Sequence, residues 1–494
     1  MKKHRYFLGI DLGTSSVKLV LIDETKQVLH VETVGYNVDQ PETGWREIDP
    51  NVWYECLASG LDLMFSKYSP EDLEGIGVSG QMHTVVLLDK EGNSVRPALM
   101  WNDVRTSEML PALRARIAQL DGHEYIEKCI STGSPAVNLL WLKENEPENF
   151  ARIHKFVIAP DYIVYRLTGQ IGTDYCEAST SCLLDIENKC WSEPLREMLG
   201  FDASIYPQIR GSACSAGAIL PQVAERFGLR SDVKVIVGTG DNPATAISTG
   251  CIGDATPCVS LGTSGVLIIN SPEPLAGAKG KKILISLDGT SFMYLIQGTV
   301  QSNGTTYEWW NCDIMGIEDL RDIDTMLKDY TLPDPHLLFF PHMMGEKTLF
   351  ADPELHGALM GMTIDTTRKD LIYAVMEGIC YGFRELAENM QLDLSLGEHI
   401  RLTGGGSRSD IWAQILANVM NVPIEQTEGS NGAGYGIALL AAYHCGLFSS
   451  LAEISKACVK IKRIFLPQPD AVAICNQKYE AYCRIYPAVK MVYP

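Results

Sequence analysis

Apolar runs separated by turn residues open the chain and predict a meander of three strands, at residues 5–12, 17–23 and 28–36. Apolar side chains then recur every three to four positions and predict an amphipathic helix that begins after Pro50. The apolar stripe of that helix consists of Trp53, Leu57, Leu61 and Met64. Two short strands follow, at 75–79 and 85–89, before a mainly helical stretch from 104 to 168. The first half therefore predicts a sheet followed by helices.

The second half of the chain repeats this order. A turn-rich stretch continues to about residue 217, and a valine-rich strand is expected at 233–237. Beyond it the pattern predicts strands at 283–287 and 291–297 and helices at 368–391, 409–419 and 433–445. A chain of 494 residues is too long for one core, and no low-complexity linker divides it. We therefore expect two α/β domains, residues 1–248 and 249–494, joined as a hinged cleft.

Charge and cysteine usage restrict the partners and the compartment. The formal net charge of −20 argues against nucleic acid or an anionic membrane surface as a partner. Fourteen scattered cysteines without a CxxC pair are typical of reduced thiols in a cytoplasmic protein. The first apolar stretch meets Asp11 too early for a signal peptide, and no run of about 18 apolar residues predicts a membrane span. A homodimer is left open.

The tetrapeptide Leu-Gly-Thr-Ser occurs twice, at residues 12–15 and 261–264. Each copy lies between two apolar runs and therefore predicts a hairpin turn. Such a turn presents backbone N–H groups and hydroxyls without a large side chain in the way, which suits phosphate oxygens. The alternative is an ordinary hairpin turn, because these residue types are common there.

Two aspartates stand at the ends of predicted strands. Asp11 precedes the first turn and could hold Mg²⁺ on a phosphate, since this ion takes only one or two protein carboxylates; otherwise it initiates the turn. Lys18 beyond the turn either reaches a phosphate or is a solvated strand residue. Asp241 follows the valine-rich strand, where open α/β sheets place ligands, and suits a general base. Alternatively, Asp241 is the N-cap of a helix that begins near Pro243.

Three further loops carry polar or glycine-rich sequences. The loop at 80–83 presents the amide of Gln81, the thioether of Met82 and the imidazole of His83, which could contact sugar hydroxyls and an apolar ligand face. The alternative for His83 is a surface or satisfied core residue. Glycine runs at 404–406 and 432–436 each open a predicted helix, where a ligand could approach the backbone.

Taken together, these segments resemble the FGGY family of carbohydrate kinases over nearly the whole chain. The resemblance rests on six motifs in the order of that family, at residues 10–18, 80–83, 101–103, 240–242, 260–265 and 404–409. It implies two actin-like (ribonuclease H-like) domains of α/β class, with ATP and sugar in the cleft between them. The first domain would hold the sugar and Mg²⁺, and the second would hold the nucleotide.

The resemblance also implies residue roles. Asp11 would orient Mg²⁺ and Asp241 would be the catalytic base. Sugar contacts would come from Gln81, Met82, His83, Trp101, Asn102, Asp241 and Asn242. Nucleotide contacts would come from Thr14, Ser15, Lys18, Gly262, Thr263, Ser264, Gly304, Gly405, Gly406 and Asp410.

The reaction that the resemblance implies is ATP-dependent phosphorylation of a sugar hydroxyl. D-xylulose is the leading substrate, with another ketopentose, a pentitol or gluconate as alternatives, because Thr84 and Asn138 depart from the usual family pattern. An actin-like or Hsp70-like ATPase would share the hairpins, but the Gln-Met-His loop and the Gly-Asp-Asn turn argue against it. A catalytically silent sugar sensor would be expected to lack Asp11 or Asp241.

Overall fold

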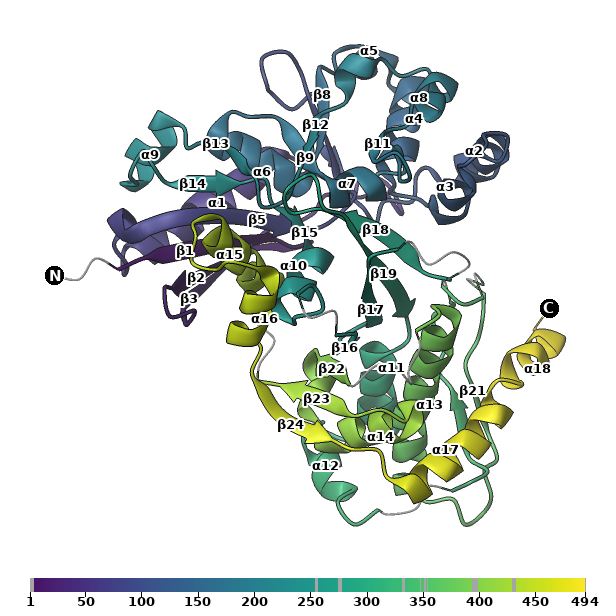
Figure 1. The fold of residues 1–494 in the computed structure, drawn as a ribbon. Helices are drawn as coiled ribbons and strands as arrows, with labels where there is room; N and C mark the ends of the chain where they lie inside the picture. The colour runs from purple at the N-terminus through teal and green to yellow at the C-terminus, as the bar shows by residue number, and fades with distance from the viewer. Residues whose placement is uncertain are drawn as a thin grey trace. The chain divides into compact units, whose positions relative to one another are not determined.

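The computed structural model describes residues 4–253, 256–273, 278–330, 334–346, 348–350, 352, 354–392, 399–428 and 432–493 (Figure 1). The chain forms two compact units, each built from three segments. Unit 1 comprises Met1–Ser248, Ile283–Tyr294 and Asn431–Cys458, and unit 2 comprises Thr249–Lys282, Leu295–Ser430 and Val459–Pro494. Among the described residues, no helix has the length and apolar character needed to cross a membrane.

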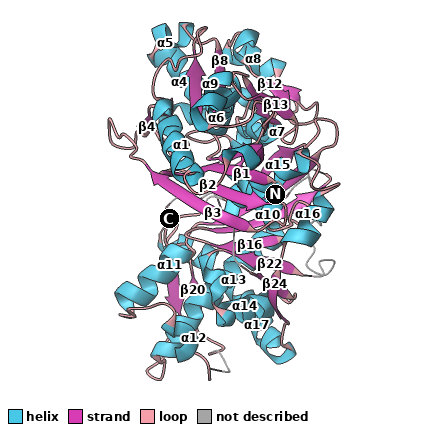
Figure 2. Cartoon of the chain, turned by 90° about the vertical axis from the view of Figure 1, so that its left-hand side faces the viewer, coloured by secondary structure: helices cyan, strands magenta, loops and turns pink. Residues whose placement is uncertain are grey.

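Unit 1 is organised around a seven-stranded sheet with the order β13-β14-β5-β1-β2-β3, and β15 also pairs with β5. Its strands are β1 (Tyr6–Leu12), β2 (Ser16–Asp23), β3 (Val28–Gly35), β5 (Leu73–Gly80), β13 (Ser215–Ala218), β14 (Lys234–Ile236) and β15 (Thr239–Gly240). The meander β1–β2–β3 is antiparallel, as predicted, and its strands lie side by side in Figure 2. Strand β5 runs parallel to β1, β14 and β15. The carboxyl ends of β1, β5 and β15 therefore meet at one edge of the sheet.

The alternation of side chains along β1 explains how this sheet is covered. Leu8 and Ile10 are fully buried in the core cluster that includes Trp53 of α1 (Pro50–Phe65) and Ile163 of α6 (Ala159–Thr168). Gly9 points to the other face, where a Cβ would lie 1.8 Å from the carbonyl oxygen of Gly434. Glycine is thus required for α15 (Gly432–His444) to pack directly on the sheet.

The rest of unit 1 surrounds this sheet. A second sheet has the order β4-β7-β6-β8 and consists of β4 (Glu47–Ile48), β7 (Ala98–Leu99), β6 (Val85–Leu88) and β8 (Lys155–Ile158). The smaller strand pairs are β9 (Gly172–Asp174) with β12 (Gln208–Arg210), and β10 (Leu184–Asp185) with β11 (Cys190–Trp191). The remaining helices are α2 (Leu110–Ile117), α3 (Glu124–Cys129), α4 (Pro135–Asn145), α5 (Pro147–Ala151), α7 (Tyr175–Thr180), α8 (Glu193–Leu199), α9 (Pro221–Phe227), α10 (Asp241–Ser248) and α16 (Leu451–Cys458).

Unit 2 contains most of a seven-stranded sheet with the order β18-β19-β17-β16-β22-β23-β24, of which β18 and the start of β19 extend into the segment Ile283–Tyr294 of unit 1. These strands are β18 (Lys281–Ile285), β19 (Met293–Val300), β17 (Gly265–Ser271), β16 (Cys258–Leu261), β22 (Ile400–Thr403), β23 (Ile424–Thr427) and β24 (Ile461–Phe465). Its helices are α11 (Gly304–Glu308), α12 (Asp322–Met326), α13 (Arg368–Asn389), α14 (Asp410–Met420), α17 (Pro469–Tyr482) and α18 (Ile485–Val492), and β20 (Leu338–Phe340) pairs with β21 (Ala358–Met360). The hairpin β16–β17 lies beside the parallel strand β22, as β1–β2 lies beside β5 in unit 1.

Candidate functional site

The first Leu-Gly-Thr-Ser segment forms the turn between β1 and β2. The backbone N–H of Gly13 donates to the carbonyl of Ser16 at 2.9 Å, so Thr14 and Ser15 lie at the tip. Asp11 at the end of β1 is opposite Lys18 of β2 in the antiparallel register. Burial raises the pKa of the Asp11 carboxyl to about 6, and the positive charge of Lys18 partly opposes this shift. The turn thus has a carboxylate and an ammonium group at its base.

The Gln81–His83 loop is anchored to this turn. The backbone N–H of Gln81 donates to the carbonyl of Leu12 at 2.8 Å, and its side-chain Nε2 donates to the carbonyl of Gly13 at 3.2 Å. The Tyr36 hydroxyl also donates to the Gly13 carbonyl. Because Gln81 is only 2% exposed, its side-chain amide braces the turn from within unit 1.

The same loop contacts the turn that carries Asp241. The side-chain amide of Asn242 lies 3.5 Å from the sulfur of Met82, which is buried. His83 is half-buried and adopts a left-handed backbone conformation with φ of 71°. Asp241 is the first residue of α10, at the carboxyl end of β15, so its carboxylate stands in the first turn of that helix. The helix begins at Asp241 and not near Pro243, so Asp241 is its first residue rather than the N-cap considered from the sequence.

The Trp101 loop completes the arrangement in unit 1. The indole N–H of Trp101 donates to the hydroxyl of Thr14 at 3.2 Å, and its backbone N–H donates to the hydroxyl of Thr84 at 3.1 Å. Thr84 in turn donates to the side-chain oxygen of Gln81 at 3.0 Å. Asn102 is exposed next to Trp101. One buried hydroxyl therefore joins two of the loops predicted to contact sugar.

A buried charge network supports the Trp101 loop. Asp103 has no exposed surface and accepts hydrogen bonds from the backbone N–H groups of Arg46 and Arg105. The Arg105 guanidinium pairs with Asp103 at 2.8 Å and with Glu47 at 2.7 Å, and it stacks 3.8 Å from the ring centre of Trp45. These bonds fix the chain direction immediately after Asn102.

In unit 2 the second Leu-Gly-Thr-Ser segment forms the turn between β16 and β17, with Ser264 exposed beside Gly262 and Thr263. The backbone N–H of Gly304 donates to the Gly262 carbonyl at 3.1 Å, and the N–H of Thr305 donates to the Thr263 carbonyl at 3.2 Å. The side chain of Asn303 also donates to the Gly262 carbonyl, at 2.7 Å. The first turn of α11 is therefore bonded directly to the hairpin tip.

The second glycine run lies against the same hairpin. A Cβ on Gly406 would lie 2.8 Å from the Cβ of Leu261, whereas a Cβ on Gly405 would meet no atom within 4 Å. Gly405 thus faces open space beside the turn. Unit 2 brings together six of its seven predicted nucleotide residues in this way, namely Gly262, Thr263, Ser264, Gly304, Gly405 and Gly406.

Asp410, the seventh, begins α14 and has protein partners of its own. Its carboxylate pairs with the half-exposed Arg463 at 2.7 Å and accepts from the Gln426 side chain at 3.2 Å. Asp324 binds this helix end from α12, because it accepts from the backbone N–H of Asp410 at 2.8 Å and from the hydroxyl of Ser409 at 2.5 Å. The carboxylate of Asp410 is therefore oriented by Arg463 and Gln426.

Several of these supporting residues carry no signal in the sequence. Thr84 stands out only as a departure from a family pattern, and Asn303 and Asp324 lie in segments without a motif. Asp103 follows Trp101-Asn102 directly, so its place in the motif at residues 101–103 was the one available signal. Each of the four acts through partners that are distant along the chain, such as Arg46 for Asp103.

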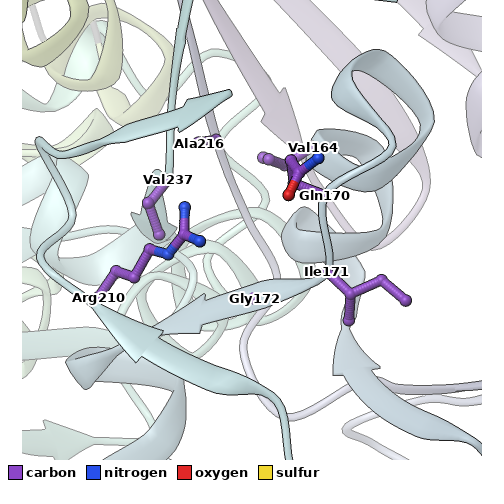
Figure 3. Close-up of a pocket in the computed structure, with 7 residues that line it drawn as sticks. All are labelled: Val164, Gln170, Ile171, Gly172, Arg210, Ala216 and Val237. Atoms are coloured by element: carbon purple, nitrogen blue, oxygen red, sulfur yellow. The ribbon is translucent and has the colours of Figure 1, made fainter. Parts of the chain in front are cut away.

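A small pocket of unit 1 lies apart from these residues (Figure 3). Val164, Ile171 and Val237 give it an apolar part, and Gln170 and Arg210 line its polar part. None of the predicted site residues belongs to its lining. The pocket is therefore a feature separate from the site assembled above.

The residues present fit a magnesium ion bound to a nucleotide. Within the described part of the chain, no three His, Cys, Asp or Glu side chains are grouped as a metal cage. Mg²⁺ on a polyphosphate takes most of its ligands from phosphate and water and needs only one or two carboxylates. The single carboxylate of Asp11, next to the turn of Thr14, matches that requirement.

Comparison with known proteins defines the class first. The N-terminal domain of the FGGY family of carbohydrate kinases matches residues 6–248, and the C-terminal domain of that family matches residues 258–445. Together the two matches cover most of the chain. The chain belongs to the FGGY family of carbohydrate kinases and has the two-domain α/β fold of the actin-like ATPase type. The expected fold class is thereby confirmed, and the protein is a kinase that acts on a small-molecule sugar with ATP.

The names of individual relatives specify a particular sugar. A xylulose kinase of Lactococcus lactis is 33% identical over 488 residues, which cover 97% of this chain and 96% of the relative. A crystal structure described as a xyloylose kinase from Brucella ovis is 29% identical, with a TM-score of 0.88 and coverage of 99% and 100% of the two chains. A gluconate kinase from Lactobacillus acidophilus has a TM-score of 0.90 at 23% identity, covers 98% of both chains, and shows likeness of fold alone.

Proposed function

We propose that this carbohydrate kinase transfers the γ-phosphoryl group of ATP to D-xylulose and forms D-xylulose 5-phosphate. The observation that carries the proposal is the full-length similarity to xylulose kinases, which reaches 33% identity in Lactococcus lactis and 31% in Staphylococcus xylosus and Bacillus subtilis. Each of these alignments covers at least 97% of this chain.

The chemistry of the sugar site supports an uncharged substrate. The side chains proposed to touch the sugar offer amides, an imidazole, an indole, a thioether and the carboxylate of Asp241, and none carries a fixed positive charge. They are Gln81, Met82, His83, Trp101, Asn102, Asp241 and Asn242. An aldonate such as gluconate carries a carboxylate, which needs a cation or several strong donors. Amides and imidazoles instead match the hydroxyl and carbonyl groups of a ketopentose.

Asp241 is the proposed catalytic base. Its carboxylate would accept the proton of the terminal sugar hydroxyl as that oxygen attacks the γ-phosphorus in line with the departing ADP oxygen. The Gln81–His83 loop and the Trp101 loop would orient the sugar. The first loop is bonded to the turn beside Asp11 and to Asn242 beside Asp241, and the second is bonded to Thr14 of the same turn beside Asp11. Catalysis by this site would consist of positioning and charge stabilisation.

The nucleotide would be bound by backbone N–H groups and hydroxyls of the two hairpin turns. Thr14, Ser15 and Lys18 would serve in unit 1, and the six residues grouped around Gly262 would serve with Asp410 in unit 2. When Mg²⁺ is bound at Asp11, it supplies positive charge to the phosphate oxygens. A cytoplasmic location and a homodimer stay predictions from the sequence.

A coupled assay of ADP release tests the proposed function. We would compare D-xylulose with other ketopentoses, pentitols and gluconate at equal concentrations, with and without ATP analogues as controls. Highest kcat/KM with D-xylulose is expected. A clear preference for gluconate or a pentitol would overturn the substrate, and ADP release that is independent of every sugar would instead indicate an ATPase.

A further inference from the structure

Two thiols of unit 1 lie in contact although they are not bonded to each other. The Sγ of Cys129, the last residue of α3, lies 3.8 Å from the Sγ of Cys182, which lies just beyond α7. The two residues are 53 positions apart in the sequence, and both are free thiols. A disulfide bond has about 2.05 Å between its sulfurs, so an approach of about 1.7 Å would close the bond.

The two thiols differ in exposure. Cys129 is partly exposed, whereas Cys182 is only 1% exposed. Oxidation of a thiol requires access from the solvent, and a disulfide then requires a second sulfur within reach. Cys129 therefore suits the thiol that an oxidant meets first, and Cys182 suits the thiol that resolves the oxidised form.

The chain on both sides of Cys182 is held by hydrogen bonds. Cys182 has a left-handed backbone with φ of 60°, which is uncommon for a residue with a Cβ and is found where the surrounding structure enforces it. The Ser181 carbonyl accepts the backbone N–H of Ala136 at 3.0 Å, and the Ser181 hydroxyl accepts the N–H of Leu183 at 3.1 Å. Cys129 instead ends a helix of six residues. Closure of a disulfide would therefore mainly displace Cys129 and the chain that follows it.

The chain after Cys129 packs on the Trp101 loop. A Cβ on Gly133 would lie 2.0 Å from the carbonyl oxygen of Trp101, so the two backbones are in direct contact. The next residue, Ser134, accepts a hydrogen bond from the thiol of Cys182 at 3.9 Å. A disulfide would remove the proton of that bond. The loop at 130–134 thus contacts both the thiol pair and a residue proposed to touch the sugar.

We propose that Cys129 and Cys182 form a reversible disulfide, which shifts the loop at 130–134 and, through Gly133, lowers the affinity of the site for sugar. The effect on the sugar rests on the proposed function, because it assumes that Trp101 contacts the sugar. Formation of the disulfide itself does not depend on that function. The thiol pair would be an oxidation-sensitive switch next to the sugar site.

A hydroperoxide such as hydrogen peroxide is the oxidant. The Cys129 thiolate attacks one peroxide oxygen, so that an S–O bond forms, the O–O bond breaks, and the hydroxide that leaves takes up a proton and becomes water. The sulfur of Cys182 then attacks the sulfur of the resulting sulfenic acid. The S–S bond forms as the S–O bond breaks, and a second water leaves with the proton of Cys182. Two thiols are oxidised, and one peroxide is reduced to two waters.

The first test treats the whole purified chain with hydrogen peroxide and maps its disulfides by mass spectrometry of a non-reduced digest. We expect a pair of peptides joined through Cys129 and Cys182, which dithiothreitol separates. Cys190→Ser is the control, because Cys190 is an exposed thiol of the same unit, and this variant should still form the cross-link. Absence of a 129–182 cross-link after peroxide treatment would overturn the proposal.

Steady-state kinetics of the reduced and oxidised forms measure the switch. Oxidation should raise the KM for D-xylulose roughly three- to tenfold, and dithiothreitol should restore it. Cys129→Ser should have the kinetics of the reduced wild type and keep them after peroxide; if it fails to fold, Cys182→Ala takes its place with the same expectation. A cross-link that leaves the KM unchanged, or an equal rise in Cys129→Ser, would overturn the effect on the sugar site.

A variant of Trp101 tests the route by which the disulfide acts. Oxidation of Trp101→Ala should raise the sugar KM no further than the substitution does, because the displaced side chain is already absent. A full additional rise would overturn the route through Trp101. Failure of the proposed function would show separately, as a reduced wild-type enzyme that phosphorylates no ketopentose, and the cross-link would still be decided by its mass.

Discussion

The indole N–H of Trp101 donates to the hydroxyl of Thr14 at 3.2 Å, which joins a loop proposed to contact sugar to a turn proposed to contact phosphate. Trp101 is 45% exposed, so this bond is open to a ligand from the solvent side. We expect Trp101→Phe to raise the KM for both substrates, by about two- to fivefold each, since a partly exposed hydrogen bond contributes about 1 kcal/mol or less.

Initial-rate kinetics with each substrate varied in turn would measure this effect. Trp309→Phe in unit 2 is the control, because Trp309 is also partly exposed and belongs to no proposed site. A Trp101→Phe enzyme that loses sugar affinity alone would show that the bond to Thr14 has no bearing on the nucleotide.

Asp241→Asn should leave the binding of sugar and ATP largely intact while lowering kcat by ~100-fold or more, the usual scale for loss of a general base. The asparagine keeps the size of the side chain at the start of α10 but cannot accept the proton of the hydroxyl. Calorimetric titration of each substrate, together with steady-state turnover, measures both quantities. Near-normal turnover would reject Asp241 as the base.

Asp11→Asn should weaken the response of the enzyme to Mg²⁺, because a charged oxygen ligand becomes neutral. The Mg²⁺ concentration for half-maximal rate is expected to rise severalfold at fixed ATP. Asp23→Asn is a suitable control, since Asp23 stands at the opposite end of β2 from the turn. Superimposable Mg²⁺ titrations of Asp11→Asn and the wild type would contradict the assignment.

Two glycines of unit 2 should respond differently to alanine. At Gly304 a Cβ would lie 2.3 Å from the Gly262 carbonyl oxygen, so Gly304→Ala must displace the hairpin tip and should raise the KM for ATP tenfold or more. At Gly405 a Cβ meets no protein atom within 4 Å, so Gly405→Ala should keep the wild-type melting temperature. Any loss of ATP affinity in Gly405→Ala would then indicate that the nucleotide lies close to Gly405. Wild-type ATP affinity in both variants would remove this region from the nucleotide site.

The sequence predicted those parts of the fold that depend on local pattern. The hairpins β1–β2 and β16–β17, helix α1 and helix α13 are visible as apolar alternation, stripes and turn residues, and the structure confirms them. Strand β8 was hidden inside a stretch expected to be helical. Its four residues, Lys155–Ile158, are too few to show a period, and they are extended because they pair with β6.

The residues of the candidate site also divide into those that the sequence reveals and those that it does not. Motif residues such as Asp11 and Asp241 are recognisable because their chemistry is local, whereas Thr84 matters through neighbours that only the folded chain supplies. A buried threonine between Gln81 and Trp101 leaves no periodic or compositional mark. The same holds for Asp324, whose partners Ser409 and Asp410 lie far along the chain.

The buried carboxyl group of Asp174, which is the N-cap of α7, predicts a pH dependence of stability. Burial raises the pKa of Asp174 to about 6 from its ordinary value of 3.8. The folded protein therefore holds a proton that the unfolded chain releases at lower pH. The contribution of this carboxyl group to stability is fully present below about pH 4 and is lost as the pH rises towards 6. Each unit of pKa shift corresponds to roughly 1.4 kcal/mol, which places the loss on the order of 1–3 kcal/mol.

Asp174→Asn should remove this dependence while keeping the helix cap, because an asparagine oxygen can accept the Glu177 N–H and cannot ionise. The melting temperature of the variant should match that of the wild type near pH 4, exceed it increasingly up to pH 6, and keep a constant lead above that. Asp288→Asn provides the opposite control, since hydrogen bonds from Ser291 and Thr290 lower the pKa of Asp288 to about 2. The contribution of the Asp288 carboxylate to stability is therefore lost only as the pH falls below 3.8. Parallel melting curves of Asp174→Asn and the wild type across pH 4–6 would show that Asp174 is ionised in the folded protein and that its burial is compensated.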